Sequence, residues 1–435
     1  MNLLFFNDRP GEHPESWYSA TAKHLPVCPS LEGEVTTDVC IIGAGFTGIS
    51  TALHLAELGY SVVVLDAQRI GFGASGRNGG QLGMGQRMDQ DDLISLVGTR
   101  SAQVLWDMAL DAQALVKSLI NRFDIDCDLK PGVANLGHNQ RIGDQMRSYA
   151  DFLNKTYGAS HIKALSVSEG REICNTSAYF GGFIDWNAAH LHPLNYVLGL
   201  ANAAQKIGVT IFENSLVTRV SQHKIRNHVH TGQGHVSCEH VVYACNGYLG
   251  NLVPSLATRI MPINNFIATT EPLSEELDVI PNENVAIADS KFVINYFRKT
   301  PDNRLLFGGG ENYSYKFPAD IAATVRKPMS EIFPQLSDTK IDYAWGGTLG
   351  ITMRRMPYFS RPSRNTWAAL GYSGHGIGTA THAGQLIAKA IHGDSSGFDA
   401  MAAVPSQRFP GGTYLRSPIL ALALTWYGLR DRFGI

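Results

Sequence analysis

A glycine motif between two apolar runs, within residues 38–66, constrains this chain more than any other feature. The stretch reads DVCIIGAGFTGISTALHLAELGYSVVVLD, in which the first apolar run precedes Gly43, Gly45 and Gly48. A helical pattern follows these glycines, and the second apolar run ends at Asp66. Strand, glycine turn, helix and strand in this order predict a βαβ unit of the Rossmann type.

Each part of this motif suits a dinucleotide ligand. The first glycine permits a tight turn, the second lets the backbone approach a pyrophosphate, and the third lets the helix pack closely on the strand. The free N–H groups at the start of the helix would face the phosphates. Asp66 follows Gly43 by 23 positions, near the spacing of a carboxylate that binds a ribose, so we expect NAD or the adenosine half of FAD rather than NADP.

Length and composition bound the remaining possibilities. A chain of 435 residues can form two large domains or three smaller ones. An apolar content of 44% with 44 glycines is typical of a soluble α/β enzyme. The net charge of −2 and the lack of a basic stripe argue against nucleic acid as a partner.

The chain carries no sign of export or of metal binding. Its six cysteines form no C-x-x-C pair, so we expect reduced thiols and a cytoplasmic protein. The apolar run at 3–6 is too short for a signal peptide, and residues 10–37 are expected to be an extended lead-in. We expect no transmembrane segment, because the apolar tail at 417–429 suits a docked helix better than an anchor. The scattered histidines, including His190 and His192, predict no metal site.

A second glycine-rich stretch, GFGASGRNGGQLGMGQ, occupies residues 71–86. Seven glycines in sixteen residues exclude a helix or the interior of a strand. A flexible linker is one interpretation. The interleaved Ser75, Arg77, Asn78 and Gln81 favour the other, a binding loop against a flat polar ligand.

Hydrophobic periodicity gives a coarse secondary structure. Helices are expected at 92–122, 145–155, 166–173, 193–207 and 379–391, and strands at 125–135, 209–212, 216–220, 240–244, 291–297, 304–307 and 366–370. The alternation of strand-like runs and turns over 260–313 indicates an antiparallel sheet.

Several motifs in one order then resemble the D-amino-acid-oxidase-like (DAO) superfamily of FAD oxidoreductases, and within it the bacterial gamma-glutamylputrescine oxidases. They are IGFGASGRNGGQ (70–81), IDCD (125–128), HLHPLN (190–195), DNRLLFGGG (302–310), FPQL (333–336), RMP (355–357), GYSGHG (371–376), FPGG (409–412) and LRDR (429–432). The resemblance implies an α/β fold, like that of glycine and sarcosine oxidases, with a Rossmann-like FAD-binding domain and a mixed antiparallel-sheet substrate domain. We expect a lead-in at 1–35, an FAD-binding domain from 36–93, 165–255 and 358–435, and a substrate domain from 94–164 and 256–357.

The same resemblance assigns residues to FAD. In the first turn and at its acidic end they are Gly43, Gly45, Phe46, Thr47, Gly48, Asp66, Ala67 and Gln68. Along the flavin and ribityl chain they are Ala74, Ser75, Arg77, Asn78, Gly79, Gly80, Gln81 and Leu82. Val217 supports the adenine, Cys245 and Asn246 are further expected contacts, and Gly374, His375, Gly376 and Ile377 cover the pyrimidine edge. A helix that starts there would stabilise the anion of reduced flavin. Tyr296 and Trp345 are expected as aromatic walls for an amine, and with His375 they form the expected catalytic set.

Two departures from the family concern substrate and cofactor. Amino-acid-oxidising relatives often carry an arginine that binds the substrate carboxylate, and here the segment 345–357 has Leu349 in its place. Sarcosine-oxidase-like relatives attach flavin to a cysteine, and here Gly347 fills that position. We therefore expect non-covalent FAD. The sequence DWNAAH at 185–190 is a further departure that could reshape the pocket.

The resemblance predicts an amine oxidase that transfers a hydride from the amine α-carbon to flavin N5. Molecular oxygen would be the second substrate, and aldehyde, ammonia and peroxide the products. A γ-glutamylputrescine-like diamine derivative is the expected substrate. Open alternatives are an oxidase of amino acids or N-methyl amino acids, a dehydrogenase with another electron acceptor, a non-catalytic flavoprotein and an NAD-only dehydrogenase. The sequence gives no oligomeric state.

Overall fold

A six-stranded sheet holds the first glycine motif. The computed structural model describes residues 3–23, 26–223, 225–281, 284–312 and 314–412. In spatial order the sheet comprises β18 (Tyr358–Ser363), β19 (Thr366–Leu370), β12 (His240–Tyr243), β2 (Val39–Ile42), β3 (Val62–Leu65) and β8 (Thr210–Phe212). All neighbours are parallel except β18 and β19. The two strands that flank the glycine motif are buried along their whole length, as their apolar runs predict.

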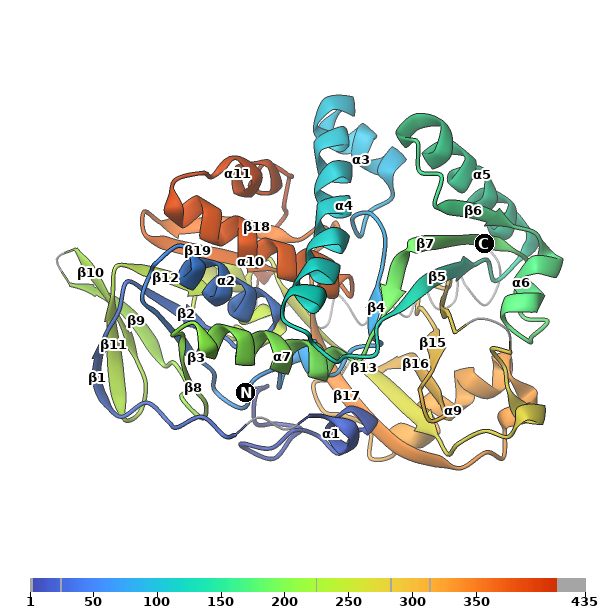
Figure 1. Cartoon of the computed structure of the whole chain (residues 1–435), viewed down its shortest axis with the longest axis horizontal. Coiled ribbons are helices and arrows are strands. Elements are labelled where there is room, and N and C mark those ends of the chain that lie inside the picture. Colours follow the sequence, from blue (N-terminus) through green and yellow to red (C-terminus); the bar gives the residue numbers. More distant parts are fainter. Residues whose placement is uncertain (1–2, 24–25, 224, 282–283, 313, 413–435) are drawn as a thin grey trace.

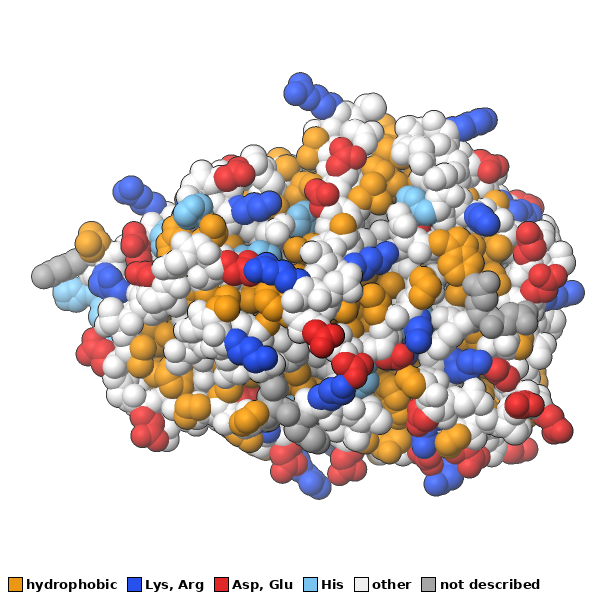
Figure 2. Space-filling view, viewed as in Figure 1, with side chains coloured by type: hydrophobic (Ala, Val, Ile, Leu, Met, Phe, Trp, Pro, Cys, Tyr) orange, Lys and Arg blue, Asp and Glu red, His pale blue; other side chains and the backbone are white. Residues whose placement is uncertain are grey.

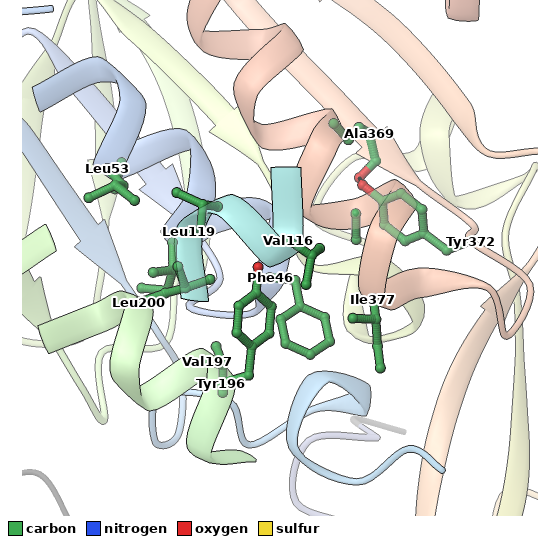
Figure 3. Close-up of a cluster of buried hydrophobic side chains, with 14 of the residues drawn as sticks. Phe46, Leu53, Val116, Leu119, Tyr196, Val197, Leu200, Ala369, Tyr372 and Ile377 are labelled. Carbon is green, nitrogen blue, oxygen red and sulfur yellow. Dashed lines mark hydrogen bonds between the residues drawn. The ribbon is translucent and has the colours of Figure 1, made fainter. Parts of the chain in front are cut away.

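Four helices pack beside this sheet and share one apolar core (Figure 1). They are α2 (Phe46–Glu57), α4 (Thr99–Arg122), α7 (Pro193–Lys206) and α10 (Gly376–His392). Figure 3 shows side chains of all four helices meeting in that core, with the rings of Phe46 and Tyr196 side by side at 5.5 Å between centroids. Because Phe46 and Ile377 stand at the first turns of α2 and α10, the core fixes both helix starts.

The second sheet has nine strands and lies beside the first (Figure 1). Eight strands follow in spatial order: β17 (Ile341–Ile351), β13 (Met261–Thr270), β16 (Leu305–Asn312), β15 (Tyr296–Lys299), β14 (Ala286–Asp289), β5 (Lys130–Leu136), β7 (Gly182–His190) and β4 (Gln81–Leu82). The ninth, β6 (Ile162–Leu165), pairs with β7. Among the described strand pairs of this sheet only β14 and β5 are parallel, so the expected mixed antiparallel sheet is confirmed.

A small third sheet and seven further helices complete the described chain. The third sheet contains β1 (Gly33–Thr36), β11 (Gly234–Cys238), β10 (Arg226–His230) and β9 (Arg219–His223). The remaining helices are α1 (Trp17–Thr21), α3 (Gln90–Val97), α5 (Gln140–Tyr157), α6 (Val167–Ile173), α8 (Pro254–Ala257), α9 (Ile321–Ile332) and α11 (Ser396–Ala402), with 3-10 turns at Ala74–Gly76, Asn246–Tyr248, Glu275–Leu277 and Pro334–Leu336.

The strands expected at 125–135 and 216–220 begin later, at Lys130 and Arg219, and three other expected elements differ for reasons that the structure shows. The expected helix at 92–122 is two helices, because Gly98 has φ +79° and separates α3 from α4. The expected strand at 291–297 begins only at Tyr296, because the Asp289 carboxylate accepts hydrogen bonds from the N–H groups of Lys291 and Asn295 and folds this segment into a loop. The extended lead-in contains α1 as well as β1, and a capping box of Ser16 and Ser19 starts that helix.

The residues of the lead-in at 3–21, here called the N-terminal segment, contact loops beside both large sheets. Asn7 bonds the backbone of Tyr315 and Phe317, and the Trp17 indole N–H donates to Asp302. Gly11 N–H donates to Gln68 Oε1 at 2.6 Å. The segment therefore connects the acidic end of the first motif with the strand region of the second sheet.

The expected domain boundaries stay a prediction. Strands β4 and β7, from the expected FAD-binding domain, belong to the nine-stranded sheet, and α4, from the expected substrate domain, packs against α10.

Acidic and basic side chains are interspersed over the face shown in Figure 2. Within the described ranges no helix combines the length and apolar character that a membrane span requires. The tail at 417–429 lies outside those ranges.

Candidate flavin site

The turn between β2 and α2 has room only for glycine at two positions. A Cβ atom at Gly48 would lie 1.8 Å from the carbonyl oxygen of Gly43, and one at Gly43 would lie 2.8 Å from that of Ala244. Gly43 also has φ +109°, which side chains disfavour. These contacts bring α2 close against the strand, as the third glycine of the motif predicts.

The start of α2 has unused hydrogen-bond donors. Gly45 is its N-cap and offers no side chain, while the N–H of Phe46 donates to Ser75 Oγ at 3.0 Å. Among the described residues, the N–H groups of Thr47 and Gly48 have no hydrogen-bond acceptor. A helix start with free N–H groups attracts phosphate oxygens.

Asp66 closes the other side of this turn. Its carboxylate accepts hydrogen bonds from the N–H of Ala44 at 2.7 Å and of Gln68 at 2.8 Å. Burial raises the pKa of Asp66 to about 6, although the two backbone donors oppose that shift. The carboxylate keeps lone pairs that could accept hydrogen bonds from ribose hydroxyls.

Four other residues expected to bind FAD are buried or hydrogen-bonded. Gln68 is fully buried, and its amide donates to the carbonyl of Leu4 in the N-terminal segment. Val217 is buried at 7% exposure. The Cys245 thiol donates to the carbonyl of Ile42, and Asn246 Oδ1 accepts the N–H of Gly371 at 2.9 Å. Burial raises the pKa of Cys245 to about 12, so this thiol stays protonated near neutral pH.

The second glycine stretch is held by its own hydrogen bonds. The Asn78 amide donates to the carbonyls of Ala74 and Ser75 at 2.9 and 3.0 Å, and its Oδ1 accepts the N–H of Gly80 at 2.8 Å. Gln81 Nε2 donates to the carbonyl of Ile287 in β14 at 2.9 Å. A flexible linker would lack such bonds, so the binding-loop interpretation fits this stretch better.

The Arg77 side chain links the loop to the N-terminal segment and to β17. Its guanidinium pairs with Asp8 of the N-terminal segment and donates to the carbonyls of Phe72 and Gly346. Arg77 Nη2 is buried and has no partner among the described residues. The side chain thus has one donor left, and its contact with FAD stays a prediction.

Tyr296 and Trp345 lie on different sides of this loop. The Tyr296 ring covers Gly79 and Gly308, where added Cβ atoms would come within 2.5 Å and 2.1 Å of the ring. Trp345 is 1% exposed, and its indole N–H donates to the carbonyl of Arg77 at 3.0 Å. Trp345 therefore supports the loop from the core, while Tyr296 is partly exposed. Their contacts with an amine stay predictions.

His375 is the N-cap of α10 and lies against the loop. Its Nε2 is 3.1 Å from the carbonyl oxygen of Gly85, and a Cβ atom at Gly83 would lie 2.7 Å from the ring. Burial, helped by the positive charge of Arg87, lowers the pKa of His375 to about 4, so the imidazole is neutral at pH 7. The side chain does not cap the N–H groups of Gly376 and Ile377.

The starts of the two helices α2 and α10 lie close together. The Thr47 hydroxyl of α2 and the Tyr372 hydroxyl before α10 lie 2.6 Å apart, and Figure 3 shows Tyr372 near Ile377. Two uncapped helix starts, the loop between them and the orphaned Arg77 Nη2 fit a cofactor with phosphates at one end and a polar ring at the other. Among the described residues no group of His, Cys, Asp or Glu could hold a metal ion.

Three residues of the candidate site were not identified from the sequence: Tyr372, Arg87 and Asp8. Tyr372 was inside the GYSGHG motif but had no role assigned, and Arg87 directly follows the glycine stretch. Asp8 gave no signal, because its partner Arg77 is 69 positions away.

Comparisons with known proteins agree with this geometry. Residues 38–390 match the model of the DAO family, described as FAD dependent oxidoreductase. The chain is 40% identical over 432 residues to the gamma-glutamylputrescine oxidoreductase of Escherichia coli K12, covering 98% of this chain and all of that protein. It is 39% identical to the probable oxidoreductase OrdL of Rhizobium meliloti, over 96% of this chain and 97% of that one. The structure of glycine oxidase from Geobacillus kaustophilus superposes with a TM-score of 0.71 at 20% identity, over 85% of this chain and 99% of that chain.

Proposed function

The chain belongs to the DAO family of FAD-dependent oxidoreductases, and from that premise we propose that it oxidises the terminal amine of γ-glutamyl diamines such as γ-glutamylputrescine. Oxygen is the proposed acceptor, and aldehyde, ammonia and hydrogen peroxide are the products. The observation that carries the proposal is the 40% identity, along the whole chain, to a gamma-glutamylputrescine oxidoreductase.

Leu349 supports an amine that has no neighbouring carboxylate. It lies on β17 and packs with Met261, Ile263 and Ile351 in a small apolar cluster. An α-amino acid would bring its carboxylate beside the reacting carbon, and an unpaired buried carboxylate costs several kcal/mol. A γ-glutamyl diamine carries its carboxylate at the far end of the molecule.

Bound FAD would supply the hydride acceptor. The residues of this chain would do the rest by position: Asp66 and the start of α2 hold the dinucleotide, and Tyr296 orients the aminoalkyl chain. Neutral His375 and the N–H groups at the start of α10 offer hydrogen bonds to the polar edge of the flavin. Hydride transfer depends on such placement more than on acid–base catalysis.

We also propose that FAD is bound without a covalent bond and that the protein acts in the cytoplasm. Gly347 stands where a cysteine would attach the flavin, and the Cys245 thiol is protonated, whereas attachment and other thiol chemistry need the thiolate. All six cysteines are unpaired, which supports a reducing compartment. Acid precipitation should leave intact FAD in the supernatant, and flavin in the pellet would contradict non-covalent binding.

A side-by-side oxygen-uptake assay tests the substrate. Purified holoenzyme is given γ-glutamylputrescine, putrescine, sarcosine and several D-amino acids, with peroxide measured in parallel. We expect the highest kcat/KM with γ-glutamylputrescine, and values lower by about two powers of ten with sarcosine and D-amino acids. If one of these two classes gives the highest value, the amino-acid oxidase alternative replaces this proposal. Flavin reduction without oxygen uptake would indicate a dehydrogenase.

A further inference from the structure

Arg298 is a buried arginine that lies against the second glycine stretch. It stands two positions after Tyr296 on β15, so both side chains leave the strand on the same face. The Tyr296 ring covers Gly79, and Arg298 Nε donates a hydrogen bond to the Gly79 carbonyl at 3.1 Å. Because Arg298 is 0% exposed, its guanidinium group is fixed inside the protein against the loop that we expect to contact the flavin.

The peptide between Gly79 and Gly80 is held at both ends. Its carbonyl accepts the hydrogen bond from Arg298, and its N–H donates to Asn78 Oδ1 at 2.8 Å. Gly80 has φ +79°, and a Cβ atom there would lie 2.2 Å from the carbonyl oxygen of Leu191 and 3.1 Å from Arg298 Nε. Only glycine therefore lets the guanidinium group come this close to the loop.

Helix α1 of the N-terminal segment also covers the guanidinium group. Arg298 Nη2 donates to the Tyr18 hydroxyl at 3.4 Å, and Arg298 Cζ lies 5.9 Å from the ring centre of Trp17 and 5.9 Å from that of Tyr18. Both aromatic residues are buried, at 4% and 0% exposure. Aromatic rings attract a cation without neutralising its charge, and here their burial keeps bulk water away from it.

Arg298 has no counterion at ion-pair distance among the described residues. Its Nη1 is buried and has no hydrogen-bond partner there. Asp128 senses the charge, because Arg298 opposes the rise that burial gives the pKa of Asp128, but the two side chains form no ion pair. Burial, together with the charge of Arg298, lowers the pKa of His190 and of His192 to about 3, so both are neutral at pH 7. A buried positive charge without a paired acid exerts a strong field on its surroundings.

We propose that Arg298 is a positioning residue that favours reduced flavin, by holding a fixed positive charge at the Gly79–Gly80 peptide. A neutral amine that gives up a hydride, with its two electrons, becomes a cationic imine, and a neutral flavin that takes up the hydride gains one negative charge. A cation that is already fixed and shielded from water stabilises that negative charge without reorganisation. This role requires flavin at the second glycine stretch, but it does not depend on which amine is oxidised.

The midpoint potential of the bound FAD tests this role without any amine. Holoenzyme is reduced stepwise with dithionite under nitrogen beside a reference dye, and the absorbance of flavin and dye gives the potential. Arg298→Gln keeps a hydrogen-bond donor but loses the charge, whereas Arg298→Lys keeps the charge. Arg326→Gln is the matched control, because Arg326 of α9 also donates to backbone carbonyls, those of Ser337 and Thr339, and forms no ion pair with a described residue.

We expect the preference of the protein for reduced over oxidised FAD to fall about tenfold in Arg298→Gln, which lowers the potential by about 30 mV for a two-electron couple. Arg298→Lys should stay within about threefold of wild type, and Arg326→Gln should match wild type. The Kd for oxidised FAD is measured for each variant, so that potentials are compared at full occupancy. Sulfite, which adds to oxidised flavin and leaves a negative charge on its ring, is a second probe, and its Kd should rise about tenfold in Arg298→Gln.

An unchanged potential in Arg298→Gln would overturn the assignment. An equal drop in Arg298→Gln and Arg298→Lys would also overturn it, because the effect would then belong to the hydrogen bond with Gly79. If Arg298→Gln does not bind FAD, Arg298→Met serves as the neutral variant, and loss of FAD from both would show that Arg298 serves binding and not reduction. Failure of the proposed function looks different: γ-glutamylputrescine would not reduce the flavin, while the potentials of the variants would still differ.

Discussion

Asp8 accepts hydrogen bonds from Arg77 Nη1 at 2.9 and 3.0 Å, in an ion pair whose side chains are 8% and 1% exposed. This pair fastens the N-terminal segment to the loop of the candidate flavin site. Because breaking a buried pair leaves a charge without compensation, we expect Asp8→Asn to lower the free energy of unfolding by roughly 3 kcal/mol.

Thermal and denaturant unfolding of the two proteins measures that loss. The control is Asp126→Asn, which breaks the exposed pair of Asp126 with Lys23 and should cost less than about 1 kcal/mol. An equal loss of unfolding free energy in the two variants would show that the buried Asp8–Arg77 pair stabilises the fold no more than an exposed pair does.

Gly45→Val should abolish flavin binding. A Cβ atom at Gly45 would lie 2.7 Å from Ser75 Oγ, which accepts the N–H of Phe46, and its methyl groups would fill the space in front of the start of α2. Flavin content is read from the absorbance of purified protein. Gly232→Val, at a glycine with no atom within 4 Å of an added Cβ, should keep full occupancy. A Gly45→Val protein that is as yellow as wild type would contradict the assignment of this turn.

Affinity for FAD should fall in acid because of Asp66. Its pKa is raised to about 6, so the folded apoprotein holds this proton more tightly than the unfolded chain. This proton therefore stabilises the folded apoprotein below pH of about 4, and that stabilisation is lost as the pH rises through 6. The ionised carboxylate is the form that accepts ribose hydroxyls. The Kd for FAD should therefore rise about tenfold per pH unit below 6.

Quenching of FAD fluorescence on binding, between pH 5 and 8, gives this profile. Asp66→Asn should bind FAD more weakly and show a flat profile over the same range. His375 does not interfere, because its pKa of about 4 keeps it neutral there. An identical slope in Asp66→Asn would assign the acid sensitivity to another group.

Replacing the Tyr296 ring should impair amine oxidation without loss of flavin. The ring packs on Gly79 and Gly308, and its hydroxyl donates to Asn265 Oδ1. If the ring face orients a cationic or neutral amine, Tyr296→Ala should lower kcat/KM about tenfold. Tyr296→Phe keeps the ring and should stay near wild type. The rate of anaerobic flavin reduction measures the effect, and an unchanged rate in Tyr296→Ala would remove this residue from the substrate site.

The parts of the fold that follow from local pattern could be predicted. The glycines at 43, 45 and 48 and the carboxylate of Asp66 belong to one continuous stretch, and the structure joins Asp66 to Ala44 of the same stretch by a hydrogen bond. Family resemblance extended this to the antiparallel sheet and to His375 at the start of α10. The structure contains the antiparallel sheet and has His375 at the start of α10, while the contacts of these parts with FAD and substrate stay predictions.

Features that depend on distant partners could not be predicted. The parallel pairing of Gly33 with Gly234 in the third sheet has no local signal. The Asp289 side chain prevents a strand from starting at Lys291, where the sequence pattern predicts one. Its carboxylate accepts hydrogen bonds from backbone N–H groups that a neighbouring strand would otherwise bind. Periodicity also gave no sign that the Trp345 indole N–H donates to the carbonyl of Arg77.

The N-terminal segment has a consequence for the order of assembly. Its residues are synthesised before the elements that they contact, because their partners reach as far along the chain as Asp302, Phe317 and Trp345, which contacts Tyr18. The segment cannot dock until those residues have left the ribosome and the second sheet has formed. Until then Arg77 lacks its counterion and the loop lacks its outer cover. The N-terminal segment thus docks long after it is made, and the flavin site is completed only late in folding.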